Sequence, residues 1–160
     1  MKIEVHTDHP SFPIYAGVVL GTGLGALFDG IVMHQLLQWH QMVSTWYPIN
    51  SVENLRLNTF WDGIFHAFAY VMVVIGIYLL LRIPHKYDQW SVFCMCGSLL
   101  LGWGLFNIIE GTINHEILGV HRVRESVPAD EQFLWDMGFL GWGAAMIAIG
   151  VLLIATRRTR

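Results

Sequence analysis

The chain has 160 residues, of which 54% are apolar and 13% are charged, and its formal net charge is −3. A soluble domain of this size carries about 25% charged residues, so the composition argues against a soluble protein and indicates a membrane protein. The sequence contains no basic patch and no nucleic-acid-binding motif, so no nucleic-acid partner is expected. Cys94 and Cys96 lie two apart in an apolar run, so no disulfide framework is expected.

Four apolar segments are long enough to cross a bilayer, which takes about 20 helical residues. In chain order they cover residues 14–33, 61–81, 91–113 and 133–155. The first is too long for the apolar core of a signal peptide, and no small-residue cleavage site follows it, so we expect it to be retained. The predicted fold is therefore all-α, a single integral membrane four-helix bundle over residues 1–160.

Basic residues predict the orientation of the spans, because Lys and Arg remain on the cytoplasmic side. Arg82 and Lys86 lie between the second and third spans, and further arginines lie at positions 157, 158 and 160. Basic residues in the loop after the third span are diluted by acids. We therefore expect a bacterial inner-membrane protein with both termini in the cytoplasm, and with loops 41–59 and 114–131 facing the periplasm or the cell exterior.

The same phrase of residues occurs twice, at the ends of the first and third spans. It reads Gly-x-Gly-Leu-x4-acid-Gly-x3-His-x2-Leu-x2-His, and it starts at Gly21 and at Gly102. The second and fourth spans also resemble each other, because each opens with Trp-Asp and has a Phe three residues after the Asp. The chain is therefore predicted to form two tandem helical hairpins, about 12–82 and 91–157, which share one orientation about an axis along the membrane normal.

Acidic and histidine side chains recur in these phrases, although each ionisable group costs roughly 2.5–3.5 kcal/mol at the centre of a bilayer. Ionisable residues within spans indicate a functional site, and imidazole together with carboxylate is a metal-ligand set. The candidate metal ligands, all expected in the outer half of the membrane, are Asp29, His34, His40, Asp62, His66, Glu110, His115, His121 and Asp136. Leu140 stands where His66 would have a counterpart, so the two halves are not expected to be equivalent.

Some of these candidates have a structural alternative. His40 and His121 would also fit as hydrogen-bonded anchors at the membrane interface. Asp62 and Asp136 would also fit as N-terminal caps of the second and fourth helices.

Helix geometry limits which ligands can meet. Asp62 and His66 are four residues apart and share a helix face, so both can reach one centre. Asp29 and His34 are five residues apart, about 140° around a regular helix, and the same holds for their counterparts in the second repeat. For each acid and its histidine to converge, the helix must distort, and a π-bulge or a break at the glycine after each acid would allow this.

The outer histidines pose a second geometric problem. Asp29 and His40 fall on one helix face but lie about 16 Å apart along a continuous helix, so they cannot bind the same ion there. Either the chain has two sites at different depths, or His40 and His121 lie on loops that fold back.

Small residues at four-residue steps precede both acids. They are Gly17, Gly21 and Gly25 in the first span, and Ser98 and Gly102 in the third. Such residues let helix backbones approach closely in lipid, so we expect them to bring neighbouring helices and their acids together.

Mixed imidazole and carboxylate ligation suits zinc, iron, manganese or copper and argues against magnesium alone. Nine ligand-type residues exceed the needs of one ion, so a dinuclear site and a single ion with a full set of supporting groups both remain open. A haem held between His34 and His115 is the alternative cofactor, but it leaves the acids without a clear role. The expected cofactor is therefore a transition metal ion, with copper, iron or zinc left open.

The phrases Asp-Gly-x3-His-x5-His, Trp-Asp-Gly-x2-His and Glu-Gly-x3-His-x5-His resemble those of a family of small predicted bacterial membrane proteins, classed as a domain of unknown function. The likeness covers residues 17–155. It implies a four-helix membrane protein and carries no established reaction.

Three functions fit these observations. The first is a membrane metalloenzyme with redox or oxygen chemistry, with hydrolysis by a metal-bound water as the second choice of reaction. The second is the handling, transport or delivery of a metal ion, although the apolar cytoplasmic half argues against a channel. The third is a haem-binding electron-transfer subunit. The expected partners are the lipid bilayer and, as alternatives left open, a second copy of the chain or a respiratory or metal-handling membrane protein.

Overall fold

The computed structural model describes residues 12–82 and 91–156, and in these ranges the regular structure is helical throughout. Helix α1 covers Ile14–Phe28 and continues as a π-helical segment, η1, over Asp29–Leu36. Helix α2 covers Val52–Leu81. Helix α3 covers Val92–Glu110 and continues as a second π-helical segment, η2, over Gly111–Ile117, and helix α4 covers Ala129–Ala155.

Four continuous helical stretches are long and apolar enough to cross a membrane, which confirms the predicted all-α fold with four spans. The structure does not describe residues 1–11, 83–90 and 157–160, so the predicted cytoplasmic location of Lys86 and of the arginines beyond residue 156 concerns residues outside the described ranges.

Two of the helices begin earlier than the apolar runs predict. Ser51 caps α2, because its Oγ accepts a hydrogen bond from the backbone N–H of Asn54 at 3.1 Å. Helix α4 begins directly after Pro128. Asp62 and Asp136 therefore lie well inside α2 and α4, and the interpretation of these two acids as N-terminal caps is wrong.

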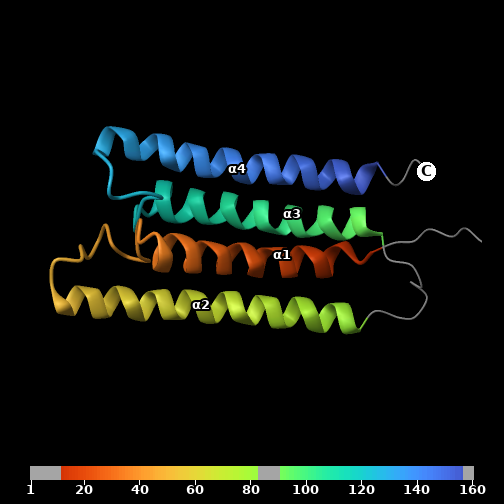
Figure 1. Cartoon of the computed structure of the whole chain (residues 1–160), viewed down its shortest axis with the longest axis horizontal. Coiled ribbons are helices and arrows are strands. Elements are labelled where there is room, and N and C mark those ends of the chain that lie inside the picture. The colour runs from red at the N-terminus through yellow and green to blue at the C-terminus, as the bar shows by residue number, and fades with distance from the viewer. Residues whose placement is uncertain (1–11, 83–90, 157–160) are drawn as a thin grey trace, which may run out of the picture.

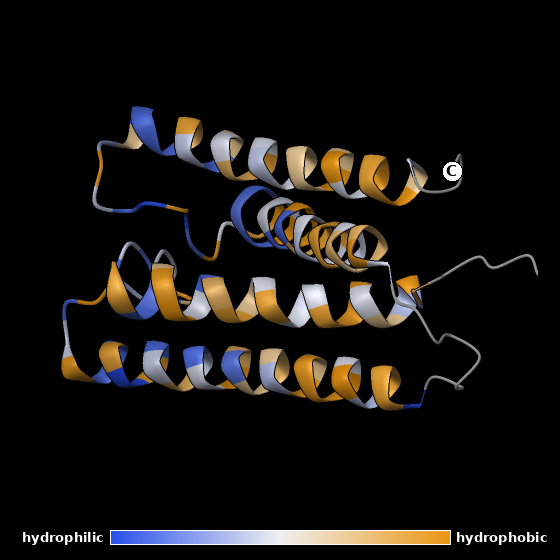
Figure 2. Ribbon diagram, turned by 45° about the vertical axis from the view of Figure 1, so that its right-hand side comes forward, coloured by the Kyte–Doolittle hydropathy of each residue, from blue (hydrophilic) through white to orange (hydrophobic). Residues whose placement is uncertain are grey.

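The four helices lie side by side in the order α2, α1, α3, α4 (Figure 1). Within the described residues, α1 packs against α2 and α3, and α4 packs against α3, but α2 and α4 make no close contact. Helices α2 and α4 are rich in apolar residues (Figure 2). Many of their large apolar side chains are exposed on the outside of the bundle, as expected of helices that face lipid. The loops that follow η1 and η2 lie together at one end of the molecule, which we call the site end.

Small residues set the central crossing of α1 and α3, as predicted. A Cβ atom added to Gly21 would collide with the carbonyl group of Leu99, and one added to Gly102 would collide with that of Val18. Gly21 and Gly102 open the two copies of the repeated phrase, and Val18 and Leu99 each lie three positions before the opening glycine of their own copy. The crossing therefore has an approximate two-fold symmetry that matches the repeat.

The outer helices dock with the same symmetry. Gly76 of α2 lies against Leu20 of α1, where a Cβ atom would be 2.7 Å from the Leu20 Cα atom. Gly150 of α4 lies in the same way against Leu101 of α3, 2.9 Å from its backbone N. Since Leu20 and Leu101 directly precede the two copies of the repeated phrase, the two hairpins have the same internal packing and share one orientation.

Candidate metal centre

The helix distorts at both acids, as the five-residue spacing predicts. The backbone N–H of Leu37 donates to the carbonyl of Val32 at 2.8 Å, and that of Leu118 donates to Ile113 at 2.8 Å. Both bonds join residues five apart, which is the pattern of a π-helix. A π-helical turn holds more residues than an α-helical one, so a side chain five positions after an acid comes to lie above it.

Each acid consequently meets its own histidine. The Nε2 atom of His34 lies 3.3 Å from Oδ2 of Asp29, and Nε2 of His115 lies 3.3 Å from Oε1 of Glu110. All four side chains are buried. The predicted convergence of the acid–histidine pairs is confirmed.

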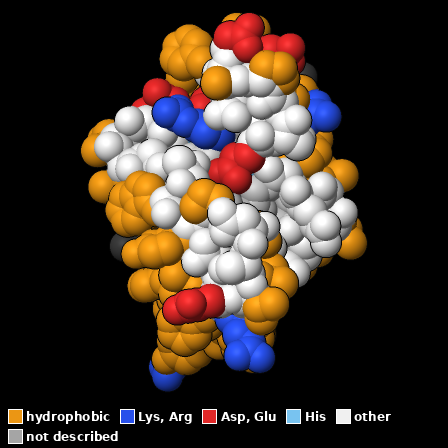
Figure 3. Space-filling model, turned by 90° about the vertical axis from the view of Figure 1, so that its left-hand side faces the viewer, with side chains coloured by type: hydrophobic (Ala, Val, Ile, Leu, Met, Phe, Trp, Pro, Cys, Tyr) orange, Lys and Arg blue, Asp and Glu red, His pale blue; other side chains and the backbone are white. Residues whose placement is uncertain are grey.

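After each π-helical segment the chain turns back toward the bundle. Gln38 and Gly119, which occupy the same position in the two copies of the repeated phrase, both adopt left-handed backbone angles, with φ of 51° and 58°. Left-handed residues commonly end helices, where they reverse the direction of the chain. His40 and His121 therefore lie on loops that fold back, and both rings are buried, so neither is visible on the surface of the site end (Figure 3).

The two loop histidines bind each other's loop. The Nδ1 atom of His40 donates to the carbonyl of Val123 at 2.8 Å, and Nδ1 of His121 donates to the carbonyl of Met42 at 2.9 Å. A carbonyl can only accept, so each Nδ1 carries a hydrogen. In a neutral ring, Nε2 then presents a lone pair.

The helix histidines are held through carboxylates instead. Nδ1 of His34 donates to Oδ1 of Asp62 at 3.0 Å, and Nδ1 of His115 lies 3.5 Å from Oδ1 of Asp136. Each acid also accepts a backbone N–H from a fold-back loop, Asp62 from Met42 at 2.8 Å and Asp136 from Val123 at 2.9 Å. Asp62 thus fixes both a histidine ring and a loop, whereas Asp136 fixes a loop and lies beside the His115 ring without a hydrogen bond to it.

The buried side chains form two overlapping groups that could each hold a metal ion. In each group the potential ligand atoms lie within 4.8 Å of one another. The first group is His34, His40 and His121, and the second is Glu110, His115 and His121. His121 belongs to both, and its Nε2 lies 3.0 Å from Oε1 of Glu110.

Several polar atoms in and beside these groups have no hydrogen-bond partner among the described residues. They are Oδ2 of Asp29, Nε2 of His34, Nε2 of His40, Oε2 of Glu110, and both ring nitrogens of His115. The approaches of His34 and His115 to their acids do not have hydrogen-bond geometry. A buried polar atom without a partner costs about 1–3 kcal/mol, so such a cluster needs a partner, which an ion, a proton or water would supply.

His40 shows the chemistry most clearly because it lies outside the membrane-spanning segments. Burial, and to a lesser extent the neighbouring His121 ring, holds the pKa of His40 well below its usual value, which favours the neutral ring. Its Nδ1–H is already donated to Val123. The lone pair on Nε2 is therefore buried and has no donor among the described residues, which is the state of a histidine that binds a metal.

Residues 16–157 match a family described as predicted membrane protein (DUF2243). The chain belongs to this family. The matched range contains both hairpins and every residue of the two groups, and it confirms the resemblance seen in the repeated phrases. No match was found among curated proteins or among solved structures.

The two halves of this family member differ in the side chain that donates to the carboxylate on the outer helix, Asp62 in α2 and Asp136 in α4. In the first half, Nε2 of Gln35 donates to Oδ2 of Asp62 at 3.2 Å. In the second, Nη1 of Arg122 donates to Oδ2 of Asp136 at 2.9 Å. Sequence reasoning missed Arg122 as a supporting residue, although its position directly after His121 was a signal.

His66 belongs to neither group within the described residues. Its Nδ1 donates to the backbone carbonyl of Asp62 at 2.7 Å, and its ring covers Gly30, where a Cβ atom would lie 2.7 Å from Nε2. Leu140 covers Gly111 in the same way, with Cδ2 at 2.9 Å. The carboxylate of Asp62 faces His34 instead, so the structure separates the predicted Asp62–His66 pair and gives His66 and Leu140 equivalent packing positions.

Proposed function

We propose that this chain is an integral membrane metalloprotein whose buried histidines and carboxylates bind one or two transition metal ions. The observation that carries the proposal is the buried, unpartnered Nε2 lone pair of His40, close to ligand atoms of His34 and His121. A hydrogen-bonded core histidine would have both ring nitrogens occupied.

The surroundings of the rings support the proposal. Histidines that bind metals donate their other ring N–H to a carboxylate, a backbone carbonyl or water. Among these rings, His34 donates to a carboxylate, and His40 and His121 donate to carbonyls. These contacts leave Nε2 of His34 and His40 as ligand atoms, whereas Nε2 of His121 is hydrogen-bonded to Glu110 and becomes a ligand atom when an ion replaces that contact.

Mixed imidazole and carboxylate ligands favour iron, copper or zinc. We propose redox or oxygen chemistry as the activity, with hydrolysis as the second choice. Carboxylates and histidines that project inward from several helices are also the arrangement of soluble di-iron bundles, although this is an analogy of layout only.

The packing of the rings disfavours haem. The ring centroids of His40 and His121 are 4.5 Å apart, and those of His115 and His121 are 4.9 Å apart. A macrocycle between two axial histidines needs the space that these contacting rings fill. A bare ion fits between their edges.

Delivery of a metal ion to a partner is the second candidate. It is favoured by the position of His40 and His121 on loops, since ligands on loops can move apart more readily than ligands on helices. We also propose that the site end faces the periplasm of a bacterial inner membrane, as the distribution of basic residues predicts.

Elemental analysis of the purified protein tests the proposal. The wild type is loaded separately with iron, copper or zinc, desalted and compared with His121→Ala and His66→Leu. We expect one or two equivalents of one metal in the wild type and in His66→Leu, and a large loss in His121→Ala. Equal metal content in all three proteins would remove the proposal. Oxygen uptake by the loaded protein with a reductant then separates an enzyme from a delivery protein.

A further inference from the structure

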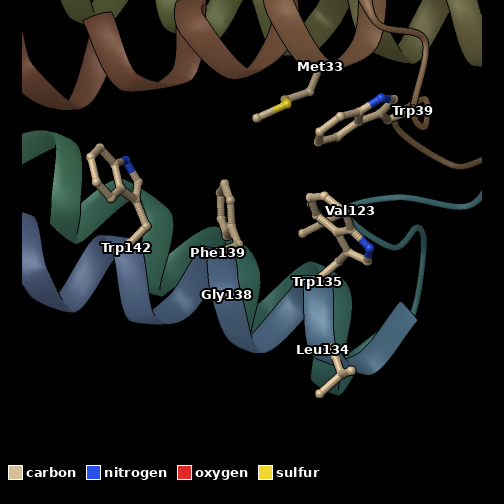
Figure 4. Close-up of a pocket in the computed structure, with 8 residues that line it drawn as sticks. All are labelled: Met33, Trp39, Val123, Leu134, Trp135, Gly138, Phe139 and Trp142. Atoms are coloured by element: carbon tan, nitrogen blue, oxygen red, sulfur yellow. The ribbon is translucent and has the colours of Figure 1, made fainter. Parts of the chain in front are cut away.

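An apolar groove lies beside the candidate metal centre, between η1 and α4 (Figure 4). Its volume is about 510 Å³, which is within the range of roughly 300–1,000 Å³ typical of small-molecule sites. Three indole rings line it, those of Trp39, Trp135 and Trp142. The groove is formed in part by η1 and α4, which both belong to stretches that are long and apolar enough to span a membrane.

The wall of the groove is also the wall of the metal centre. The backbone carbonyl of Val123, a lining residue, accepts the Nδ1–H of His40. The ring of Phe139, another lining residue, has its centroid 5.4 Å from that of His115. A molecule in the groove would therefore be separated from His40 by Val123 and from His115 by Phe139.

The groove departs from the internal repeat. Gly138 lines it, and a Cβ atom added there would meet nothing within 4 Å. When the Trp-Asp pairs of α2 and α4 are aligned, the counterpart of Gly138 is Ile64, and the counterpart of Trp39 in the second copy of the repeated phrase is Val120. A larger residue at the glycine position and a smaller one at the indole position make the equivalent face of the other hairpin a poorer host for a flat ring.

A positive charge packs against two of the indoles that line the groove. The guanidinium carbon of Arg124 is 5.0 Å from the ring centroid of Trp39 and 4.9 Å from that of Trp135. Stacked on these two lining indoles, the guanidinium offers N–H donors to oxygen atoms of a bound molecule.

We propose that this groove binds a lipophilic molecule with a planar, oxygen-bearing ring, of the quinone class, that enters from the bilayer. The indoles pack against the ring, the apolar length of the groove takes its hydrocarbon chain, and Arg124, which packs on Trp39 and Trp135, supplies N–H donors for its oxygens. The further claim that this molecule is a substrate of the metal centre rests on the proposed function. Its binding to the groove can be measured independently of that function.

The test uses full-length protein in lipid nanodiscs and decylubiquinone as the probe, with quenching of tryptophan fluorescence as the signal. Gly138→Leu fills the groove. Gly141→Leu is the matched control, because Gly141 is in the same helix, also has nothing within 4 Å of an added Cβ atom and does not line the groove. We expect saturable quenching by the wild type, an apparent Kd at least tenfold higher for Gly138→Leu, and one within twofold for Gly141→Leu.

Equal Kd values for the two leucine variants, or quenching that does not saturate, would overturn the proposal. Equally strong quenching by a brominated phospholipid would overturn it too, because the occupant would then be an acyl chain. Trp142→Ala gives a second variant if Gly138→Leu does not fold, and it should also weaken binding. Metal content is measured in parallel, so a wild-type protein that holds metal but does not bind the quinone contradicts this inference alone, whereas a wild-type protein without metal contradicts the proposed function.

Discussion

The rings of His40 and His121 stack face to face, with centroids 4.5 Å apart and planes inclined by 4°. They come from equivalent loops of the two repeats, and each ring donates a hydrogen bond to the loop of the other. The stacked pair therefore lies where the two repeats meet and joins the two halves of the candidate metal centre.

We expect His121→Ala to remove more metal than any other single substitution, because His121 belongs to both ligand groups. His66→Leu should retain the metal content of the wild type, since Leu140 fills the equivalent position in the second repeat. Metal-to-protein ratios after desalting check both. A loss of metal in His66→Leu equal to that in His121→Ala would contradict this arrangement.

Asp62→Asn should lower metal affinity by about 10–100-fold without abolishing binding, because Asp62 holds the His34 ring and does not lie in either ligand group. Competition with a chelator of known affinity measures the change. Asn54→Ala in the first turn of the same helix provides a control away from the rings. An unchanged affinity in Asp62→Asn would show that the carboxylate does not support a ligand.

Gly21→Ala and Gly102→Ala should each destabilise the protein by about 1–3 kcal/mol, because the added methyl group collides with the backbone of the facing helix. Gly63→Ala is the matched control, since nothing lies within 4 Å of its added Cβ atom and alanine favours the helix. Unfolding in detergent compares the three. Equal stability of Gly21→Ala and Gly63→Ala would mean that α1 and α3 are not in contact.

Gly119→Ala should destabilise the fold-back loop by about 1–2 kcal/mol, because alanine adopts a φ of 58° unfavourably. Gln38→Gly should instead stabilise its loop, since Gln38 has a φ of 51° and glycine adopts this angle without the steric cost of a side chain. Thermal unfolding distinguishes them. Shifts of the same sign would contradict the left-handed geometry.

The proposed orientation predicts that a cysteine at the site end reacts from outside the cell. In a protein with both native cysteines replaced by alanine, Ser126→Cys should react with a membrane-impermeant maleimide in intact cells. Thr156→Cys at the opposite end of α4 should react only after permeabilisation. The reverse pattern would place the site end in the cytoplasm.

Much of this architecture is predictable from sequence because it depends on local spacing. Asp29 and His34 are five residues apart, so their side chains can converge only if the helix distorts, and the structure has a π-helical segment there. The glycines at four-residue steps likewise predict close approach of helices in lipid. Both signals can be read within a single helix, without knowledge of its neighbours.

The features that sequence reasoning missed depend on contacts between distant segments. Nothing about Gln38 indicates a left-handed residue, so the return of His40 to the bundle could only be kept as an alternative. Ser51 caps α2 before its polar first turns, so the helix begins well before its apolar run. Asp62 therefore lies mid-helix and not at the N-terminus, as its place at the start of the apolar run suggested. The packing of His66 over Gly30 could not be predicted either, because Gly30 lies on another helix.

X-ray absorption at the edge of the bound metal tests the central claim most directly. We predict that protein purified from membranes, without added chelator, shows the absorption edge of iron, copper or zinc. Its fine structure should contain the multiple-scattering signal of at least two imidazole ligands per ion, and this signal should be lost in His121→Ala. A sample without a transition-metal edge, or a metal shell without imidazole, would contradict the account.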